Sequence, residues 1–264
     1  MKKALLCLDE NLASSIALRY ADCIPDLIET DIYLIHVEEP DKRQQAGTGW
    51  VRRTMEKGIK ELGREAVQRL LRTEKVKFRF KGAPNIVVGD REREILFELK
   101  VGEYDLYIEG NVSTPNPAEF FDLVTSKLYS KAPCPILMVK NLAVNNRVAL
   151  LCGDGVDHDL LVGSFLHLTD NRDVEVDMVF YKFQEKNEIS FLDRKEGGSD
   201  LEAVEKALLE GGKQIKGCHV VSGTPEVVGD YLKDFAFVAS TLPTRKSPRM
   251  EVMANTPVSL LLCH

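Results

Sequence analysis

The chain has 264 residues, with 35 basic and 41 acidic side chains and a formal net charge of −6. This balance argues against a dedicated nucleic-acid-binding protein, which carries a basic patch, and no apolar run approaches the ~20 residues of a membrane-spanning helix. Six cysteines without a CxxC pair lie mostly within apolar runs, which favours reduced, buried thiols in the cytoplasm.

The first half alternates short apolar runs with segments of helical periodicity. Strands are expected at 3–8, 31–37, 76–80, 86–88, 104–108 and 136–139. Helices are expected over about 12–24 (ending near Pro25), 51–72, 95–99 and 118–131. Strands and helices that alternate this regularly predict an α/β fold with a parallel, doubly wound sheet.

After a linker at 140–146, the same pattern begins again. Three pairs of segments correspond in the same order: 3–9 with 147–154, 86–91 with 220–225, and 132–138 with 254–261. An ordered internal repeat predicts two like domains, 1–140 and 147–264, the second of them shortened.

The loop at 110–117 connects a predicted strand to a predicted helix. A helix N-terminus that follows a strand is the usual place for a phosphate. The tight turn Ala132-Pro133-Cys134-Pro135 then ends the helix, because proline cannot continue it.

These segments resemble the universal stress protein family. The resemblance rests on Asp9, on 35–37 and 88–90, and above all on 105–110 and 132–139. It implies two Rossmann-like domains of the HUP type, each a five-stranded parallel sheet with helices on both faces. It also implies a stress-response or regulatory role, and domains that pair through their last strands and so bury exposed strand edges. A homodimer and an unidentified protein partner stay open.

The family divides into members that bind ATP and members that do not. In the ATP-binding members, an aspartate after the first strand and the end of the second strand hold adenosine, and a G-x2-G-x9-G-[ST] loop holds the phosphates. In this chain Asp9 matches the aspartate, Val37 the strand end and Gly110 the first glycine. Thr125 and Ser126 supply hydroxyls near the end of the motif.

The remainder of the phosphate loop departs from that pattern. Ser113 stands at the second glycine, and Asp122 stands at the third glycine. Pro115 and Pro117 remove amide donors, and Asp122, expected near the helix start, would take the place of a phosphate and repel one. The sequence therefore predicts a crippled phosphate site in the first half.

In the second half, 240–243 replace the glycine loop, which predicts that no phosphate site exists there. Solvated charged faces explain Arg245 and Lys246, and an anionic ligand held by these two and Arg249 is the alternative.

Each candidate residue also has an ordinary structural interpretation. Asp9 and Asp154 would cap the helices that follow them, His36 would be a hydrogen-bonded strand residue, and Thr125 and Ser126 would lie on a helix surface. No catalytic triad, carboxylate pair or metal-ligand spacing stands out in the sequence.

Three functions follow from these observations. The first is a non-enzymatic stress-response protein with a degenerate ATP loop. The second is an ATP sensor that uses Asp9, Val37, Gly110, Thr125 and Ser126 of the first domain, with ATP as its ligand. The third is an ATP-pyrophosphatase-like enzyme, which needs an SGGxDS-type loop that the ends of both first strands lack.

Overall fold

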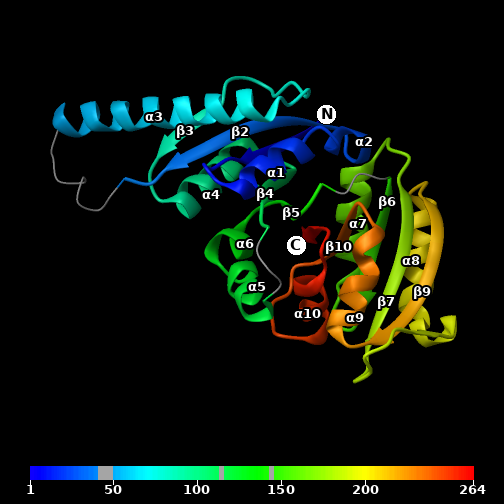
Figure 1. Ribbon diagram of the computed structural model, residues 1–264. Coiled ribbons are helices and arrows are strands. Elements are labelled where there is room, and N and C mark those ends of the chain that lie inside the picture. Colours follow the sequence, from blue (N-terminus) through cyan, green and yellow to red (C-terminus); the bar gives the residue numbers. More distant parts are fainter. Residues whose placement is uncertain (41–49, 113–115, 143–145) are drawn as a thin grey trace.

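A computed structural model describes residues 1–40, 50–112, 116–142 and 146–264. These residues form a sheet of 11 strands in the order β3-β2-β1-β4-β5-β11-β10-β6-β7-β9-β8 (Figure 1). Within them, no helix is long and apolar enough to cross a membrane.

The first half supplies five parallel strands. They are β1 (Lys2–Cys7), β2 (Thr30–Glu38), β3 (Asn85–Val88), β4 (Leu106–Gly110) and β5 (Ile136–Val139). The second half supplies β6 (Arg147–Gly153), β7 (Glu175–Phe183), β8 (Ser190–Leu192), β9 (Gln214–Gly223), β10 (Phe237–Thr241) and β11 (Ser259–Cys263). Its strands are parallel except for β8, which pairs antiparallel with β9. The predicted fold class is confirmed, and β8 is an addition that the sequence did not indicate.

Helices cover both faces of this sheet. Buried residues of α1 (Leu12–Tyr20), α2 (Ile24–Leu27), α3 (Trp50–Glu74), α7 (His158–Thr169) and α8 (Gly198–Glu210) pack on one face. Those of α4 (Arg91–Gly102), α5 (Pro117–Val124), α6 (Lys127–Lys131), α9 (Pro225–Tyr231) and α10 (Pro248–Asn255) pack on the other. Each apolar layer contains residues from both halves, so the core continues across the whole sheet.

The two halves meet where β5 pairs antiparallel with β11. Leu137 lies opposite Leu261 in this ladder, and both are buried. Just beyond β5, the Lys140 ammonium donates to the carbonyl oxygens of Met253 (3.1 Å) and Thr256 (2.8 Å) at the end of α10. Edge-to-edge pairing removes two exposed strand edges from solvent.

The strand predicted at 76–80 is wrong. The amide of Phe78 donates to the Asp22 carboxylate (2.8 Å) instead of joining a ladder. The alternation of apolar residues still has a structural cause, because Val76, Phe78 and Phe80 pack against the core. The sheet edge is β3 instead.

Two predicted helix boundaries also change. Pro25 lies in the first turn of α2, where the missing amide proton costs nothing, so it begins a helix instead of ending one. The helix predicted at 118–131 is two helices, because α5 ends at Val124 and Ser126 caps the start of α6.

We expect the seam between the halves to carry a large share of the stability. Leu261→Ala should lower the free energy of unfolding by about 2–5 kcal/mol, since it opens a cavity in a closed core. Leu209→Ala, at a mostly exposed leucine of α8, should change it by less than about 0.5 kcal/mol. Urea denaturation followed by circular dichroism measures both, and equal effects would contradict the packing of β5 on β11.

Candidate functional site

Each half of the sheet has one point at which the strand order reverses. In the first half it lies between β1 and β4, and in the second half between β6 and β10. In open α/β sheets, ligands bind outside the carboxyl ends of the strands at such a point. These two switch points are therefore the candidate sites.

In the first half, the guanidinium of Arg91 lies against the carboxyl ends of β1 and β4. It donates to the Glu109 carboxylate (3.0 Å) and pairs with Asp9 (3.4 Å), and it lies 3.5 Å from the Cys7 sulfur. Arg91 is the first residue of α4, whose N-cap is Asp90. The start of α4 thus places a cation between two acids at the switch point.

Glu109 is 7% exposed and accepts further hydrogen bonds from the hydroxyls of Tyr107 (2.8 Å) and Tyr129. Burial, together with the negative charge of Glu109, raises the pKa of both phenols well above the usual value. Burial opposes the charge of Arg91, but the surrounding acidic groups outweigh it and raise the arginine's pKa. Both carboxylate oxygens of Glu109 thus accept hydrogen bonds. The cluster contains two carboxylates and one guanidinium, so its formal charge is negative.

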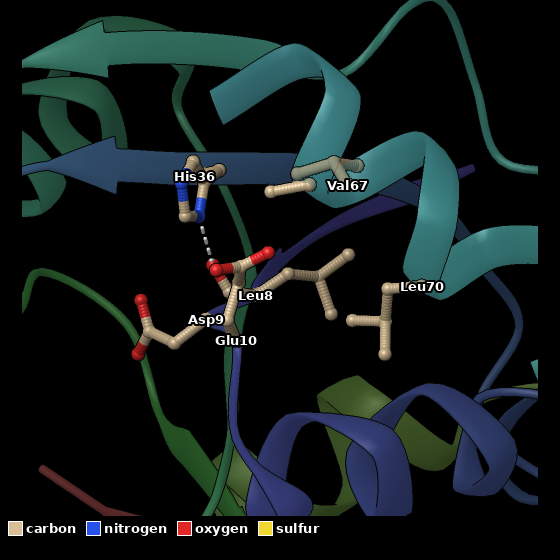
Figure 2. A pocket seen from close by; sticks show the side chains of 7 residues that line it. Leu8, Asp9, Glu10, His36, Val67 and Leu70 are labelled. Atoms are coloured by element: carbon tan, nitrogen blue, oxygen red, sulfur yellow. Dashed lines mark hydrogen bonds between the residues drawn. The ribbon is translucent and has the colours of Figure 1, made fainter. Parts of the chain in front are cut away.

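Among the described residues, a pocket of about 10 Å³ lies beside Asp9. Figure 2 shows Val67 and Leu70 of α3 pointing toward Leu8, while the Asp9 carboxylate points away from them. A space of this size holds about one water molecule. The long helix α3, which lies along β2 and β3 (Figure 1), contributes Ala66, Val67 and Leu70 to the lining of this pocket.

His36 is held in place beside this pocket. Its Nδ1 donates to the Leu8 carbonyl (2.6 Å), and its Nε2 lies 2.9 Å from the Glu38 carboxylate. Gly63 of α3 packs directly on these two side chains, since a Cβ there would lie 2.9 Å from a carbon of each. This glycine therefore allows α3 to approach the strand ends closely.

The other predicted site residues have local structural roles. A Cβ at Gly110 would overlap the backbone carbonyl of Ala13, so the approach of α1 already requires glycine there. Val37 is buried in β2, beside β3. The Thr125 hydroxyl donates to Phe121 (2.7 Å) at the end of α5.

Ser126 accepts from the Tyr129 amide (3.4 Å) as the N-cap of α6. Asp9 and Gly110 thus end neighbouring strands, whereas the hydroxyls of Thr125 and Ser126 satisfy backbone groups of their own helices.

The predicted place of Asp122 is wrong. Asn116 caps α5 by accepting from the Ala118 amide (3.0 Å), and Pro117 occupies the first turn, where its fixed φ suits a helix. Asp122 consequently lies in the last turn of α5 and does not occupy a phosphate position. Ser113 and Pro115 lie outside the described residues.

The predicted capping roles of Asp9 and Asp154 are also wrong. Asn11 caps α1 through the Ser14 amide (2.8 Å), and Asp157 caps α7 through the Leu160 amide (3.0 Å). Neither Asp9 nor Asp154 therefore caps the helix that follows it.

The second half contains a much larger pocket, with a volume of about 320 Å³. Its walls are Asp154 at the end of β6, Tyr181 and Phe183 at the end of β7, and 245–249 at the start of α10. Small-molecule sites have volumes of roughly 300–1,000 Å³. The sequence predicted no phosphate site in the second half, yet this pocket is larger than the one beside Asp9 and is lined by three basic residues, Arg245, Lys246 and Arg249.

Arg249 lines this pocket and is 7% exposed. Its guanidinium donates to the Ser240 hydroxyl (2.8 Å) and the Thr241 carbonyl (2.9 Å), both at the end of β10. Its Nε has no hydrogen-bond partner among the described residues. Burial, and to a lesser extent the charge of Arg245, lowers the pKa of Arg249 to about 10, so it remains a cation at neutral pH.

Sequence reasoning missed Arg91 and Glu109. The available signal was Glu109 itself, a charged residue directly after an apolar run that predicts a buried strand. Such a residue needs a cationic partner. Within the described part of the chain, no group of three or more His, Cys, Asp or Glu side chains is placed to hold a metal ion.

No family model and no curated relative matches the chain. A universal stress protein from Archaeoglobus fulgidus DSM 4304 superimposes with a TM-score of 0.59 and 17% identity, covering 99% of this chain and 95% of its own. The chain has the universal stress protein fold over its whole length.

Two further structures show the same fold. A putative universal stress protein from Pseudomonas aeruginosa UCBPP-PA14 gives a TM-score of 0.56 at 17% identity, covering 99% of this chain and 92% of its own. A functionally unknown protein from Pseudomonas aeruginosa PAO1 gives 0.55 at 16% identity, with the same coverages. Identities this low establish the fold alone and do not carry the function of these proteins over to this chain.

The charged cluster of the first half should be essential to stability. Glu109→Ala should lower the free energy of unfolding by about 3 kcal/mol, since it removes the buried carboxylate that Arg91 and both tyrosines contact. Glu10→Ala, at an exposed acid paired loosely with Arg69 (3.6 Å), should cost less than about 1 kcal/mol. Urea denaturation compares the two, and an unchanged midpoint for Glu109→Ala would refute the role given to the cluster.

Proposed function

We propose that the protein is a non-enzymatic stress-response or regulatory protein of the universal stress type, whose first half does not bind ATP tightly. The observation that carries this proposal is the ion-pair cluster at the switch point of the first half. Arg91 already binds Asp9 and Glu109 there, and the adjacent pocket holds about 10 Å³.

Electrostatics argue against a nucleotide at this position. A triphosphate would approach two carboxylates balanced by one guanidinium, so the net field repels it. Recruiting Arg91 to the phosphates would leave Glu109 buried without its cationic partner, which costs several kcal/mol. Because 1.4 kcal/mol is a tenfold change in affinity, a cost of about 3 kcal/mol weakens binding more than a hundredfold.

The same contacts weigh against the two other functions. An ATP sensor would use the carboxylate of Asp9 and the hydroxyls of Thr125 and Ser126, all three of which have partners within the protein. An enzyme would need a free general base, and both ring nitrogens of His36 have partners.

We further propose that 1–140 and 147–264 are two domains, joined where β5 pairs with β11, and that the protein is cytoplasmic. The five-strand order of the first half and the similar order of β6, β7, β9, β10 and β11 support the first point. The six free cysteines support the second, because thiols stay reduced in the cytoplasm.

Isothermal titration with Mg·ATP tests the proposal. We expect the first half to give no binding tighter than about 1 mM. The wild type is compared with Asp9→Ala and with the double variant Arg245→Ala/Lys246→Ala, each checked for folding by circular dichroism.

Micromolar binding that disappears in Asp9→Ala and persists in the double variant would overturn the proposal. Binding that disappears only in the double variant would place the nucleotide in the second half and leave the first half closed, as proposed.

A further inference from the structure

The charge of the chain is distributed unevenly along its sequence. Residues 50–81, which comprise α3 and the segment that follows it, contain 11 basic and 4 acidic residues and so carry a net charge of +7. The remaining residues, 24 basic and 37 acidic, carry −13. The overall charge of −6 therefore conceals a strongly basic segment.

We propose that this segment is a binding surface for single-stranded nucleic acid, which it contacts through the phosphate groups of the backbone. The surface lies where α3 runs along β2 and β3 (Figure 1). It uses exposed side chains of α3, not those that line the pocket beside Asp9. The inference therefore goes beyond the proposed function and does not depend on it.

The first argument is a row of basic residues on α3, called the basic row below. Its members are exposed and follow one another at spacings of three or four residues: Arg53, Lys57, Lys60, Arg64, Gln68 and Arg72. An α-helix has about 3.6 residues per turn, so such spacings place side chains along one side of the helix. With a rise of about 1.5 Å per residue, the row is about 28 Å long.

The basic row runs against the ordinary preference of a helix. Like charges three or four residues apart repel each other and destabilise the helix that carries them. Arg53, Lys57, Lys60 and Arg64 form three such pairs in succession, and within this run Arg64 pairs with Glu61 (2.5 Å). Local rules are broken most often where function requires it. A chain of phosphates along the row would remove the repulsion.

The second argument is the segment after α3, which adds further cations. Exposed basic residues alternate with apolar residues that pack against the core, in the order Lys75, Val76, Lys77, Phe78, Arg79, Phe80 and Lys81. The amide of Phe78 is held by Asp22, and the amide of Lys81 donates to the Ile32 carbonyl (2.8 Å). Lys81 also pairs with Asp31 (3.2 Å). The segment is thus fixed in place, and Lys77 and Arg79 extend the positive surface beyond the end of α3.

The shape of this surface favours a linear polyanion over a flat membrane. Glu61 and Glu65 are exposed on α3 and lie about 100° around the helix from Lys60 and Arg64. A flat anionic surface that covers the helix would meet these carboxylates, whereas a single chain of phosphates can follow the basic row alone. Helices that bind membranes also insert an apolar face, and the apolar face of α3 packs on the sheet.

A single strand also fits the basic row better than a duplex does. The backbone of a duplex winds through a full turn in about 34 Å, so it would leave a straight row of about 28 Å. Phe78 and Phe80 pack against the core, so this segment offers phosphate contacts and not base stacking. Binding should therefore be independent of base sequence and strongly dependent on salt.

Fluorescence anisotropy with a labelled single-stranded RNA of about 20 nucleotides tests the proposal. At about 50 mM salt it should bind at least about tenfold more tightly than duplex RNA or polyglutamate of the same length. If about five phosphates are contacted, the affinity should fall roughly a hundredfold between about 50 and 200 mM salt.

The variant Lys57→Gln/Lys60→Gln should weaken RNA binding at least about tenfold and flatten its salt dependence, because it removes two phosphate contacts. The matched control is Lys206→Gln/Lys233→Gln, which changes the net charge equally at two exposed lysines of the second half and should leave the affinity unchanged. Circular dichroism checks folding, and the first variant should melt no lower than the wild type, since it relieves repulsion within α3.

Absence of RNA binding at about 100 μM protein and about 50 mM salt would overturn the proposal, since even non-specific complexes form in that range. Equal losses in the two double variants, or tighter binding of the duplex, would do so too. Equal affinity for polyglutamate would point to an acidic protein instead, and binding to phosphatidylserine vesicles without binding to RNA would point to a membrane. Either result would refute a nucleic-acid surface.

Discussion

A guanidinium that is partly or fully withdrawn from water is stabilised by negative charge close to it. Each half of this sheet places an arginine at its switch point, the half-buried Arg91 in the first and the buried Arg249 in the second. In the first half, the Arg91 guanidinium lies at the ends of β1 and β4, where it forms ion pairs with Asp9 and Glu109. In the second half, the Arg249 guanidinium lies at the end of β10, and its hydrogen-bond acceptors among the described residues are neutral, including the Ser240 hydroxyl and the Thr241 carbonyl. Among the described residues, the guanidinium of the first half is thus paired with acids, whereas that of the second half is not.

The helices that follow the second strand of each half reinforce this contrast. α3 supplies Ala66, Val67 and Leu70 to the small pocket beside Asp9, so its apolar face fills the space. None of the residues lining the larger pocket belongs to α8, the corresponding helix of the second half. The antiparallel pairing of β5 with β11 holds both arrangements in one continuous sheet.

Much of the fold could be predicted from the sequence, because apolar runs and helical periodicity report burial directly. The predicted element boundaries were wrong where a local contact decides them. The Asp22 carboxylate accepts from the amide of Phe78, so no strand forms there, and α5 begins at Pro117, so Asp122 lies in its last turn. The candidate site was predicted less well. Asp9 and Gly110 do end adjacent strands, but Arg91 comes from a distant helix start, and sequence periodicity does not show which side chains meet in space. The same limit hid the pocket around Arg249, whose lining comes from three separate segments.

A crystal structure of the full chain grown with Mg·ATP tests the role of the Arg91 cluster most directly. The account predicts no nucleotide beside Asp9 and Arg91 still bound to Glu109. Nucleotide beside Asp9 with Arg91 displaced would contradict it.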